Sequence, residues 1–172
     1  MTEIEVKIKI SDPKSLQKKI ITQGAQLLSP RHLEENIFYD FPSQDLHKKR
    51  NALRLRRIHK KGYLTFKGPP QKSRKFKIRE EYETEIKNVK QLQKILKNLG
   101  LNPVFQYKKH RTILKKKNLV VCIDETDIGN YIELEGEQNE IVKFSKGMGF
   151  SKNDFIKLDY VQMLKNKEAG KP

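Results

Sequence analysis

The chain has 172 residues, among them 37 lysines and arginines against 21 aspartates and glutamates, which gives a formal net charge of +16. Its length predicts one domain. Its single cysteine excludes an internal disulfide, and it has no apolar run of the roughly 20 residues that a membrane-spanning helix needs. We therefore expect a cytoplasmic protein that does not enter membranes and whose partners are polyanions.

The charge is distributed unevenly along the chain. Residues 46–79 contain fourteen lysines and arginines and no acidic residue, whereas acidic residues collect at 3–5, 80–85 and 124–140. Short carboxylate clusters beside a long basic region indicate a metal together with phosphate, rather than a surface that only coats a polyanion.

The elements follow from hydrophobic spacing and from cap residues. In chain order we predict a strand at 2–10, a helix at 12–23, strands at 26–41, 52–59, 63–67 and 76–86, a helix at 88–98, strands at 103–115, 119–125 and 130–137, a short helix at 139–146 and a last helix at 153–164. Asp12 and Pro13 begin the first helix and Gly24 ends it, while Asn88 and Gly100 do the same for the second long helix.

The connections between strands are short. Residues 61–62, 116–118 and 127–129 read as hairpin turns, so the sheet should be antiparallel. Eight such strands can close into a barrel. We therefore predict an α+β fold with a closed eight-stranded antiparallel β-barrel, a single domain at 1–165 and a flexible tail at 166–172, present as a monomer or a homodimer.

Charged and aliphatic residues alternate on several strands. Glu3, Glu5 and Lys7 alternate with Ile4 and Val6, so one face carries the charges. The same alternation places the following charged residues on the polar faces of their strands: Arg54, Arg56, Lys67, Asp124, Glu133 and Glu135.

Like charges side by side on a strand are unfavourable unless opposite charge lies among them. Mg²⁺ or Mn²⁺, which prefers oxygen ligands, would supply it to Glu3, Glu5, Glu133 and Glu135. A chain of phosphates would supply it to a basic set consisting of Arg54, Arg56, Lys67, Lys109 and Arg111. The phase of the 76–86 strand is open; we select Glu83 and Glu85 as further metal ligands, on the face of Lys77 and Arg79.

The same residues resemble the motifs of the CYTH proteins, or triphosphate tunnel metalloenzymes, which include class IV adenylate cyclases, thiamine triphosphatases and inorganic triphosphatases. The matching motifs are Glu-x-Glu-x-Lys at Glu3, Glu5 and Lys7, Arg-x-Arg at Arg54 and Arg56, Thr-x-Lys-Gly-Pro at 65–69, a basic-then-acidic strand at 77–85, Lys-x-Arg at Lys109 and Arg111, and a late series at Asp124, Gly129, Glu133 and Glu135. They occur in the family's order over nearly the whole chain. The sequence departs from the family at Asp159, where a serine often precedes the tyrosine of the last helix.

The resemblance implies an eight-stranded tunnel with the four glutamates as metal ligands and with a set of phosphate-binding residues consisting of Arg54, Arg56, Lys67, Lys77, Arg79, Lys109 and Arg111. Asp124 would lie near the metals or near a basic partner. We assign catalytic roles to Lys7, Glu5 and Asp124, with Lys7 steadying the charge that develops on the phosphate.

Three functions are consistent with these residues. We favour a metal-dependent hydrolase whose small-molecule substrate is inorganic triphosphate, thiamine triphosphate or a nucleoside triphosphate. The alternative is an adenylate cyclase that converts ATP into cyclic AMP and pyrophosphate, although no adenine-binding motif is evident. A nucleic-acid or polyphosphate binding module fits the net charge, but it has no use for Glu3, Glu5, Glu133 and Glu135.

Overall fold

The protein is described by a computed structural model that covers residues 2–170. Its elements are β1 (Thr2–Ile10), α1 (Pro13–Thr22), β2 (Gln26–Asp40), α2 (Asp45–Lys48), β3 (Ala52–Ile58), β4 (Lys61–Lys67), β5 (Lys77–Ile86), α3 (Val89–Asn98), β6 (Asn102–Lys116), β7 (Leu119–Thr126), β8 (Gly129–Glu135), α4 (Gln138–Met148), a short 3₁₀ helix (Lys152–Asp154) and α5 (Tyr160–Glu168).

The strands form a closed barrel in the order β1-β5-β4-β3-β2-β6-β7-β8. The pairings described between neighbouring strands are antiparallel, as in the hairpins β3–β4 and β7–β8. The predicted α+β fold with a closed eight-stranded barrel is therefore confirmed.

The chain divides into two compact units, each with an apolar cluster of its own. The first unit comprises residue 2, residues 33–71 and residues 79–108, and the second comprises residues 3–32, 72–78 and 109–170.

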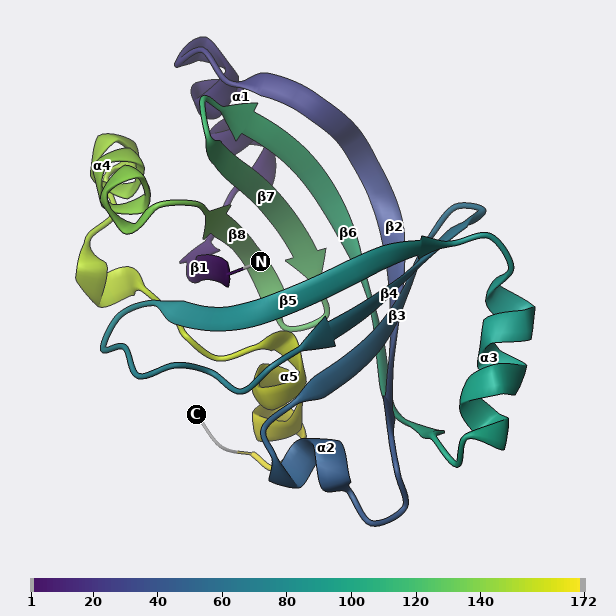
Figure 1. The fold of residues 1–172 in the computed structure, drawn as a ribbon. Coiled ribbons are helices and arrows are strands. Elements are labelled where there is room, and N and C mark those ends of the chain that lie inside the picture. Colours follow the sequence, from purple (N-terminus) through teal and green to yellow (C-terminus); the bar gives the residue numbers. More distant parts are fainter. Residues whose placement is uncertain (1, 171–172) are drawn as a thin grey trace. The chain divides into compact units, whose positions relative to one another are not determined.

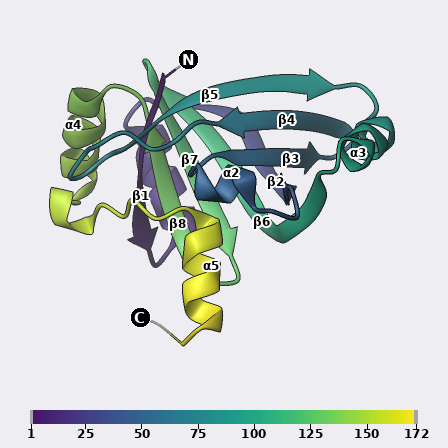
Figure 2. The same ribbon diagram turned by 60° about the horizontal axis from the view of Figure 1, so that its bottom comes forward.

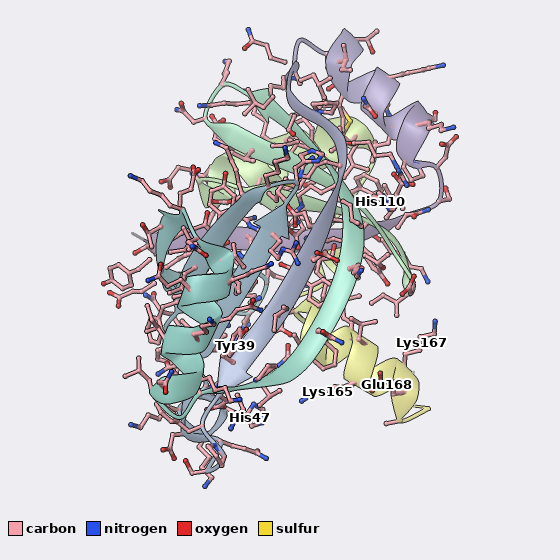
Figure 3. All side chains as sticks on the ribbon, turned by 90° about the vertical axis from the view of Figure 1, so that its right-hand side faces the viewer. Tyr39, His47, His110, Lys165, Lys167 and Glu168 are labelled. Atoms are coloured by element: carbon pink, nitrogen blue, oxygen red, sulfur yellow. The ribbon has the colours of Figure 1, made fainter. Side chains whose placement is uncertain are left out.

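In the first unit β3, β4 and β5 run side by side, and α3 follows β5 (Figures 1 and 2). Its apolar cluster is built around Tyr39, Leu55, Leu96 and Leu101. The hydroxyl of Tyr39, on β2, accepts a hydrogen bond from Gln93 of α3 at 3.4 Å, and Figure 3 shows this tyrosine beside the helix.

In the second unit β7 and β8 run side by side (Figure 1). Its apolar cluster contains Val6 and Ile8 of β1 together with Ile132 and Leu134 of β8. These are the even-numbered positions of both strands, so the odd-numbered, charged positions lie on the opposite face.

The caps of α1 and α3 are those predicted. The carboxylate of Asp12 accepts hydrogen bonds from the backbone amides of Lys14 and Ser15 at 3.0 Å, and the side chain of Asn88 accepts one from Gln91 at 3.0 Å. The residue after the C-cap of each helix is a glycine with a left-handed backbone, Gly24 after α1 and Gly100 after α3.

The turn predicted at residues 61–62 is wrong. The chain turns at residues 59–60, and Gly62 lies inside β4, opposite Arg57. A Cβ atom on Gly62 would lie 2.3 Å from Cγ2 of Val89. The glycine therefore serves the close approach of α3 to the strand rather than a turn.

The C-terminal region also differs from the prediction. Residues 153–164 do not form one helix, because the 3₁₀ helix ends at Asp154 and α5 begins only at Tyr160. Asp159 caps α5 by accepting a hydrogen bond from the amide of Gln162 at 2.9 Å. The helix continues through Glu168, so it passes residue 165, and its Lys165, Lys167 and Glu168 are labelled in Figure 3. Residues 171 and 172 of the predicted tail lie outside the described part of the chain.

Candidate functional site

The charged side chains gather into two clusters, one in each unit. In the second unit, β1 and β8 pair so that Glu5 lies opposite Glu135 and Lys7 opposite Glu133. Since all four positions are odd-numbered, these side chains share the face opposite the apolar cluster. Glu3 belongs to the same face and is partly buried.

Lys7 is the central cation of this cluster. Its ammonium lies 2.9 Å from Glu133 and 3.5 Å from Glu5, and only 3% of its side chain is exposed. Burial alone would lower its pKa, but the carboxylates of Glu133 and Glu5 outweigh burial and raise the pKa of Lys7 above its ordinary value. Lys7 is therefore a fixed positive charge and does not serve as a base near neutral pH.

Asp124 holds the other cations of the second unit. Its fully buried carboxylate accepts hydrogen bonds from the ammonium of Lys109 at 2.9 Å, from Nε and Nη2 of Arg111 at 2.6 and 2.5 Å, and from the hydroxyl of Tyr160 at 2.8 Å. Arg111 also contacts Glu133. Asp124 thus lies next to basic partners and fixes the direction in which two cations point.

Tyr160 also belongs to this cluster, although it was not predicted from the sequence as a site residue. Besides its bond to Asp124, its ring lies 5.0 Å from the ammonium of Lys7 and 4.7 Å from that of Lys109, both within the range of cation–π attraction. Burial and the nearby carboxylates of Asp124 and Glu133 raise the pKa of Tyr160 well above its ordinary value, so its phenol remains protonated. The sequence offered one signal, the tyrosine at the start of the last helix.

The carboxylate of Glu133 is held ionised by these cations. Burial would raise the pKa of Glu133, but Lys7, Arg111 and Lys109 hold it well below its ordinary value. Glu5 is likewise bound, since the ammonium of Lys77 lies 2.9 Å from its carboxylate.

The metal ligands predicted from the sequence were Glu3, Glu5, Glu83, Glu85, Glu133 and Glu135. Within residues 2–170, no three His, Cys, Asp or Glu side chains are gathered closely enough to hold a metal ion by themselves. The donor chemistry of β1 and β8 nevertheless suits Mg²⁺ or Mn²⁺, because Glu5 and Glu135 face each other across the pair. Mg²⁺ is commonly held by one or two carboxylates together with water and substrate phosphates.

The second cluster, in the first unit, is centred on Glu83 of β5. Its carboxylate accepts two hydrogen bonds from Nη2 of Arg56 at 2.8 and 2.9 Å and one from the hydroxyl of Thr65 at 2.6 Å, and Nη2 of Arg54 lies 3.6 Å away. Thr65 lies opposite both Arg54 and Glu83 in the sheet. The register of three adjacent strands therefore assembles the group.

Two further acids complete the first-unit cluster. Glu81 lies 2.7 Å from the ammonium of Lys67, and Glu34, fully buried on β2, lies 3.7 Å from Arg56. Burial would lower the pKa of Arg54, but Tyr107, Glu81 and other neighbours raise it. Glu34 and Glu81 were not selected from the sequence. Glu34 is followed directly by Glu35, which lies on the other face of the strand, and the phase of β5 was open.

Two predicted residues occupy different surroundings. Arg79 donates hydrogen bonds to backbone carbonyls, from Nε to Gly68 at 2.5 Å and from Nη2 to Arg50 at 2.8 Å and Lys67 at 3.2 Å. Its guanidinium therefore connects the segment just before β3 with the end of β4. Glu85, at the far end of β5, is about half exposed and lies 3.4 Å from Lys61.

The fold and the two clusters define a closed antiparallel β-barrel protein whose strands carry buried cations paired with carboxylates. The model of the CYTH domain matches residues 1–147, and the chain belongs to the CYTH family. None of the helices described for residues 2–170 is long and apolar enough to span a membrane.

Individual relatives cover nearly the whole chain. A protein of Methanocaldococcus jannaschii named "Putative adenylate cyclase" is 27% identical over 174 residues, which is 95% of this chain and 98% of the relative. A solved structure from Vibrio parahaemolyticus, also described as "a putative adenylate cyclase", has a TM-score of 0.87 at 20% identity and covers 96% of this chain and 98% of its own. A "putative adenylyl cyclase" from Hippeastrum, described as having a dominant triphosphatase activity, has a TM-score of 0.71 at 21% identity and covers 99% and 97%. At these identities the two solved structures support the fold.

Proposed function

We propose that the protein is a metal-dependent hydrolase that acts on a triphosphate-containing substrate. The observation that carries this proposal is the second-unit cluster, in which buried cations and buried carboxylates alternate on one face. A hydrolase of this kind needs both charges, because the cations bind phosphate oxygens and the carboxylates hold a divalent metal.

The cations are suited to a chain of phosphates. Arg111 and Lys109 are fixed by one carboxylate, that of Asp124, so they present defined directions rather than flexible surface charge. Arg54, Arg56 and Lys67 of the first unit are proposed as further phosphate-binding cations. Guanidinium groups bind phosphate oxygens two at a time, and ammonium groups act as point charges.

Glu5 and Glu135, with Glu3 and Glu133 near them in sequence and on the same face, would hold Mg²⁺ or Mn²⁺. A bound metal of this kind neutralises phosphate charge and lowers the pKa of a coordinated water. Lys7 remains protonated and is placed to stabilise negative charge that develops on a phosphate oxygen. Asp124 is proposed to position Lys109 and Arg111 rather than to transfer a proton, since its oxygens already accept four hydrogen bonds.

The second candidate function is cyclisation of ATP. It is favoured by the name of the Methanocaldococcus jannaschii relative, which matches 95% of this chain. The same phosphate-binding residues would serve this reaction, in which the ribose 3′-oxygen attacks the α-phosphorus and pyrophosphate leaves.

Purified protein should be incubated with tripolyphosphate, ATP and thiamine triphosphate in Mg²⁺ or Mn²⁺, and the products separated by chromatography. Orthophosphate release supports the hydrolase, and cyclic AMP with pyrophosphate supports the cyclase. Glu5→Gln should abolish turnover. Glu125→Gln is the matched control, because Glu125 lies on β7 in an exposed pair with Arg31 at 2.7 Å. Absence of turnover of all three substrates by the wild type, with either metal, would refute the proposal.

A further inference from the structure

The segment that precedes β5, residues 72–75, carries cations that the proposed site does not use. Lys72 and Arg74 are exposed, and Lys75 is half-buried. Within residues 2–170, none of the three forms an ion pair with a carboxylate, whereas the cations at the centre of both clusters do. An anion can therefore bind to this segment without displacing a carboxylate, which binding inside the clusters requires.

The segment is held in place by residues 155–157, which precede α5 and lie beside it (Figures 1 and 2). The ammonium of Lys157 donates a hydrogen bond to the carbonyl of Ser73 at 2.5 Å. The ring of Phe155 lies edge-to-face on that of Phe76, with centroids 5.9 Å apart and an angle of 64° between the planes. A basic segment fixed in this way loses less conformational freedom on binding than a flexible loop, so its cations bind an anion more strongly.

The acidic side chains near residues 155–157 are engaged with other groups. The carboxylate of Asp154 accepts hydrogen bonds from the amide and the hydroxyl of Ser151 at 2.7 and 2.9 Å, and that of Asp159 accepts one from the amide of Gln162 at 2.9 Å. The positive charge of the basic segment is therefore not compensated locally. Such a surface attracts an anion that carries several charges.

The basic segment continues directly into the second-unit cluster. Lys77, two residues after Lys75, begins β5, and its ammonium lies 2.9 Å from the carboxylate of Glu5. A linear anion with one end in the cluster can thus extend along residues 72–75 without leaving the basic surface. A chain of phosphates longer than a triphosphate matches both regions, because lysine and arginine bind each of its phosphates in the same way.

The aromatic residues of this region favour a phosphate chain without bases. Nucleic acid strands are normally held by exposed aromatic rings on which the bases stack, in addition to a basic groove. Phe76, the aromatic residue next to the three cations, is 7% exposed and packs in the apolar cluster of the second unit, with Phe155 against it. The segment therefore offers cations for phosphates and no exposed ring for a base.

We propose that Lys72, Arg74 and Lys75 form an outer phosphate-binding surface, and that the substrate of the hydrolase is a condensed polyphosphate longer than triphosphate. This assignment rests on the proposed function, because the end of the chain lies in the second-unit cluster while the following phosphates lie along residues 72–75. Water attacks the terminal phosphorus, and the P–O–P bond to the next phosphate breaks. The products, orthophosphate and a chain shorter by one phosphate, together carry the elements of that water.

Binding of tripolyphosphate and of a size-fractionated longer polyphosphate should be measured by calorimetry in EDTA, which prevents metal-dependent turnover. The test variant combines three substitutions in the segment, Lys72→Gln, Arg74→Gln and Lys75→Gln. The matched control removes the same charge from exposed positions elsewhere in the second unit, on α1 and α4, with Lys14→Gln, Lys18→Gln and Lys143→Gln. Urea denaturation of both variants checks that they are folded.

The test variant is expected to bind the longer polyphosphate about 10- to 100-fold more weakly than the wild type. The affinity should also depend less steeply on salt, because fewer counterions are released. Its affinity for tripolyphosphate should change only by the small, screened effect that the control variant shares.

Four results would overturn the outer surface. Absence of binding of the longer polyphosphate to the wild type would exclude this ligand, and equal losses in the test and control variants would show that net charge alone attracts it. Equal losses for both ligands in the test variant would show that the segment only supports the second-unit cluster. A greater loss for a single-stranded oligonucleotide than for polyphosphate would make nucleic acid the partner. If instead the wild type hydrolysed no triphosphate with either metal while the test variant still lost affinity for the longer chain, the proposed function would fail and the outer surface would remain.

Discussion

Replacing Asp124 with asparagine tests whether the second-unit cluster depends on one buried negative charge. The substitution keeps the shape of the side chain but removes the charge that faces Lys109 and Arg111, both nearly fully buried. Arg111 retains its contact with Glu133, whereas the closest carboxylate described for Lys109 is that of Asp124, at 2.9 Å. Lys109 is therefore the cation that loses most of its electrostatic stabilisation in this variant.

Removing one partner of a buried ion pair costs about 3–5 kcal/mol. Because Arg111 keeps Glu133, we expect the lower end, about 3 kcal/mol, of a total stability on the order of 5–15 kcal/mol. Part of this loss comes from the new NH₂ group. It is a hydrogen-bond donor and faces other donors, whereas the carboxylate oxygen in its place accepted their hydrogen bonds.

The free energy of unfolding should be measured by urea denaturation at pH 7, with Glu125→Gln as the control. That substitution breaks the exposed pair with Arg31 and should cost about 0.5 kcal/mol or less. The urea dependence should be the same for both variants and the wild type. If Asp124→Asn unfolded within about 1 kcal/mol of the wild type, the carboxylate would not be the counter-charge of these cations.

Three further predictions concern neighbouring residues. Tyr160→Phe removes one of the four hydrogen bonds to Asp124 and should cost about 1 kcal/mol in the same denaturation assay; an unchanged midpoint would show that the hydroxyl contributes nothing. The fold lowers the pKa of Glu133 below its ordinary value of 4.5, so the stability that this carboxylate contributes is present above pH 4.5 and is lost as the pH falls below it. Glu133→Gln should therefore lose stability less steeply than the wild type over that acid range. Unfolding measured in parallel for both proteins as a function of pH would reveal or exclude this difference. Arg56→Lys should weaken tripolyphosphate binding about 10-fold because the planar fork is lost, while Arg57→Lys, in an exposed pair, should not; equal effects in calorimetry would indicate general charge attraction.

Much of the fold was predictable because its signals are local. Alternation along each strand and the caps at Asp12 and Asn88 depend on neighbours in sequence. The predictions of secondary structure were wrong where contacts between residues distant in sequence determine the local conformation. Gly62 resembles a turn residue, and only the packing of Val89 against it explains why it lies in a strand. The segment before α5 is extended because Ile156 pairs with Lys7 by two backbone hydrogen bonds, at 2.8 and 3.1 Å. No local sequence pattern predicts this pairing.

The candidate site divides in the same way. Alternation correctly placed Glu5 and Lys7 on the face opposite the apolar residues, but it could not reveal that Lys7 lies opposite Glu133, because that register joins strands from the two ends of the chain. Tyr160 was missed for the same reason, since it reaches Asp124 across 36 residues of sequence. The roles proposed for the predicted metal and phosphate residues remain predictions that the experiments above test.

The pairing of charges within each cluster bears on what the protein binds. The sequence suggested that strands bearing one sign need counter-charge from outside, yet the structure supplies it from adjacent strands: Glu83 pairs with Arg56, and Glu133 with Lys7. A plain polyanion would have to displace these carboxylates and leave them buried without a cation, which is costly. A triphosphate accompanied by a divalent cation brings both signs, so the carboxylates exchange one cation for another while the basic groups gain phosphate oxygens. The net charge of +16 would attract either ligand, but the paired clusters favour the one that carries its own metal.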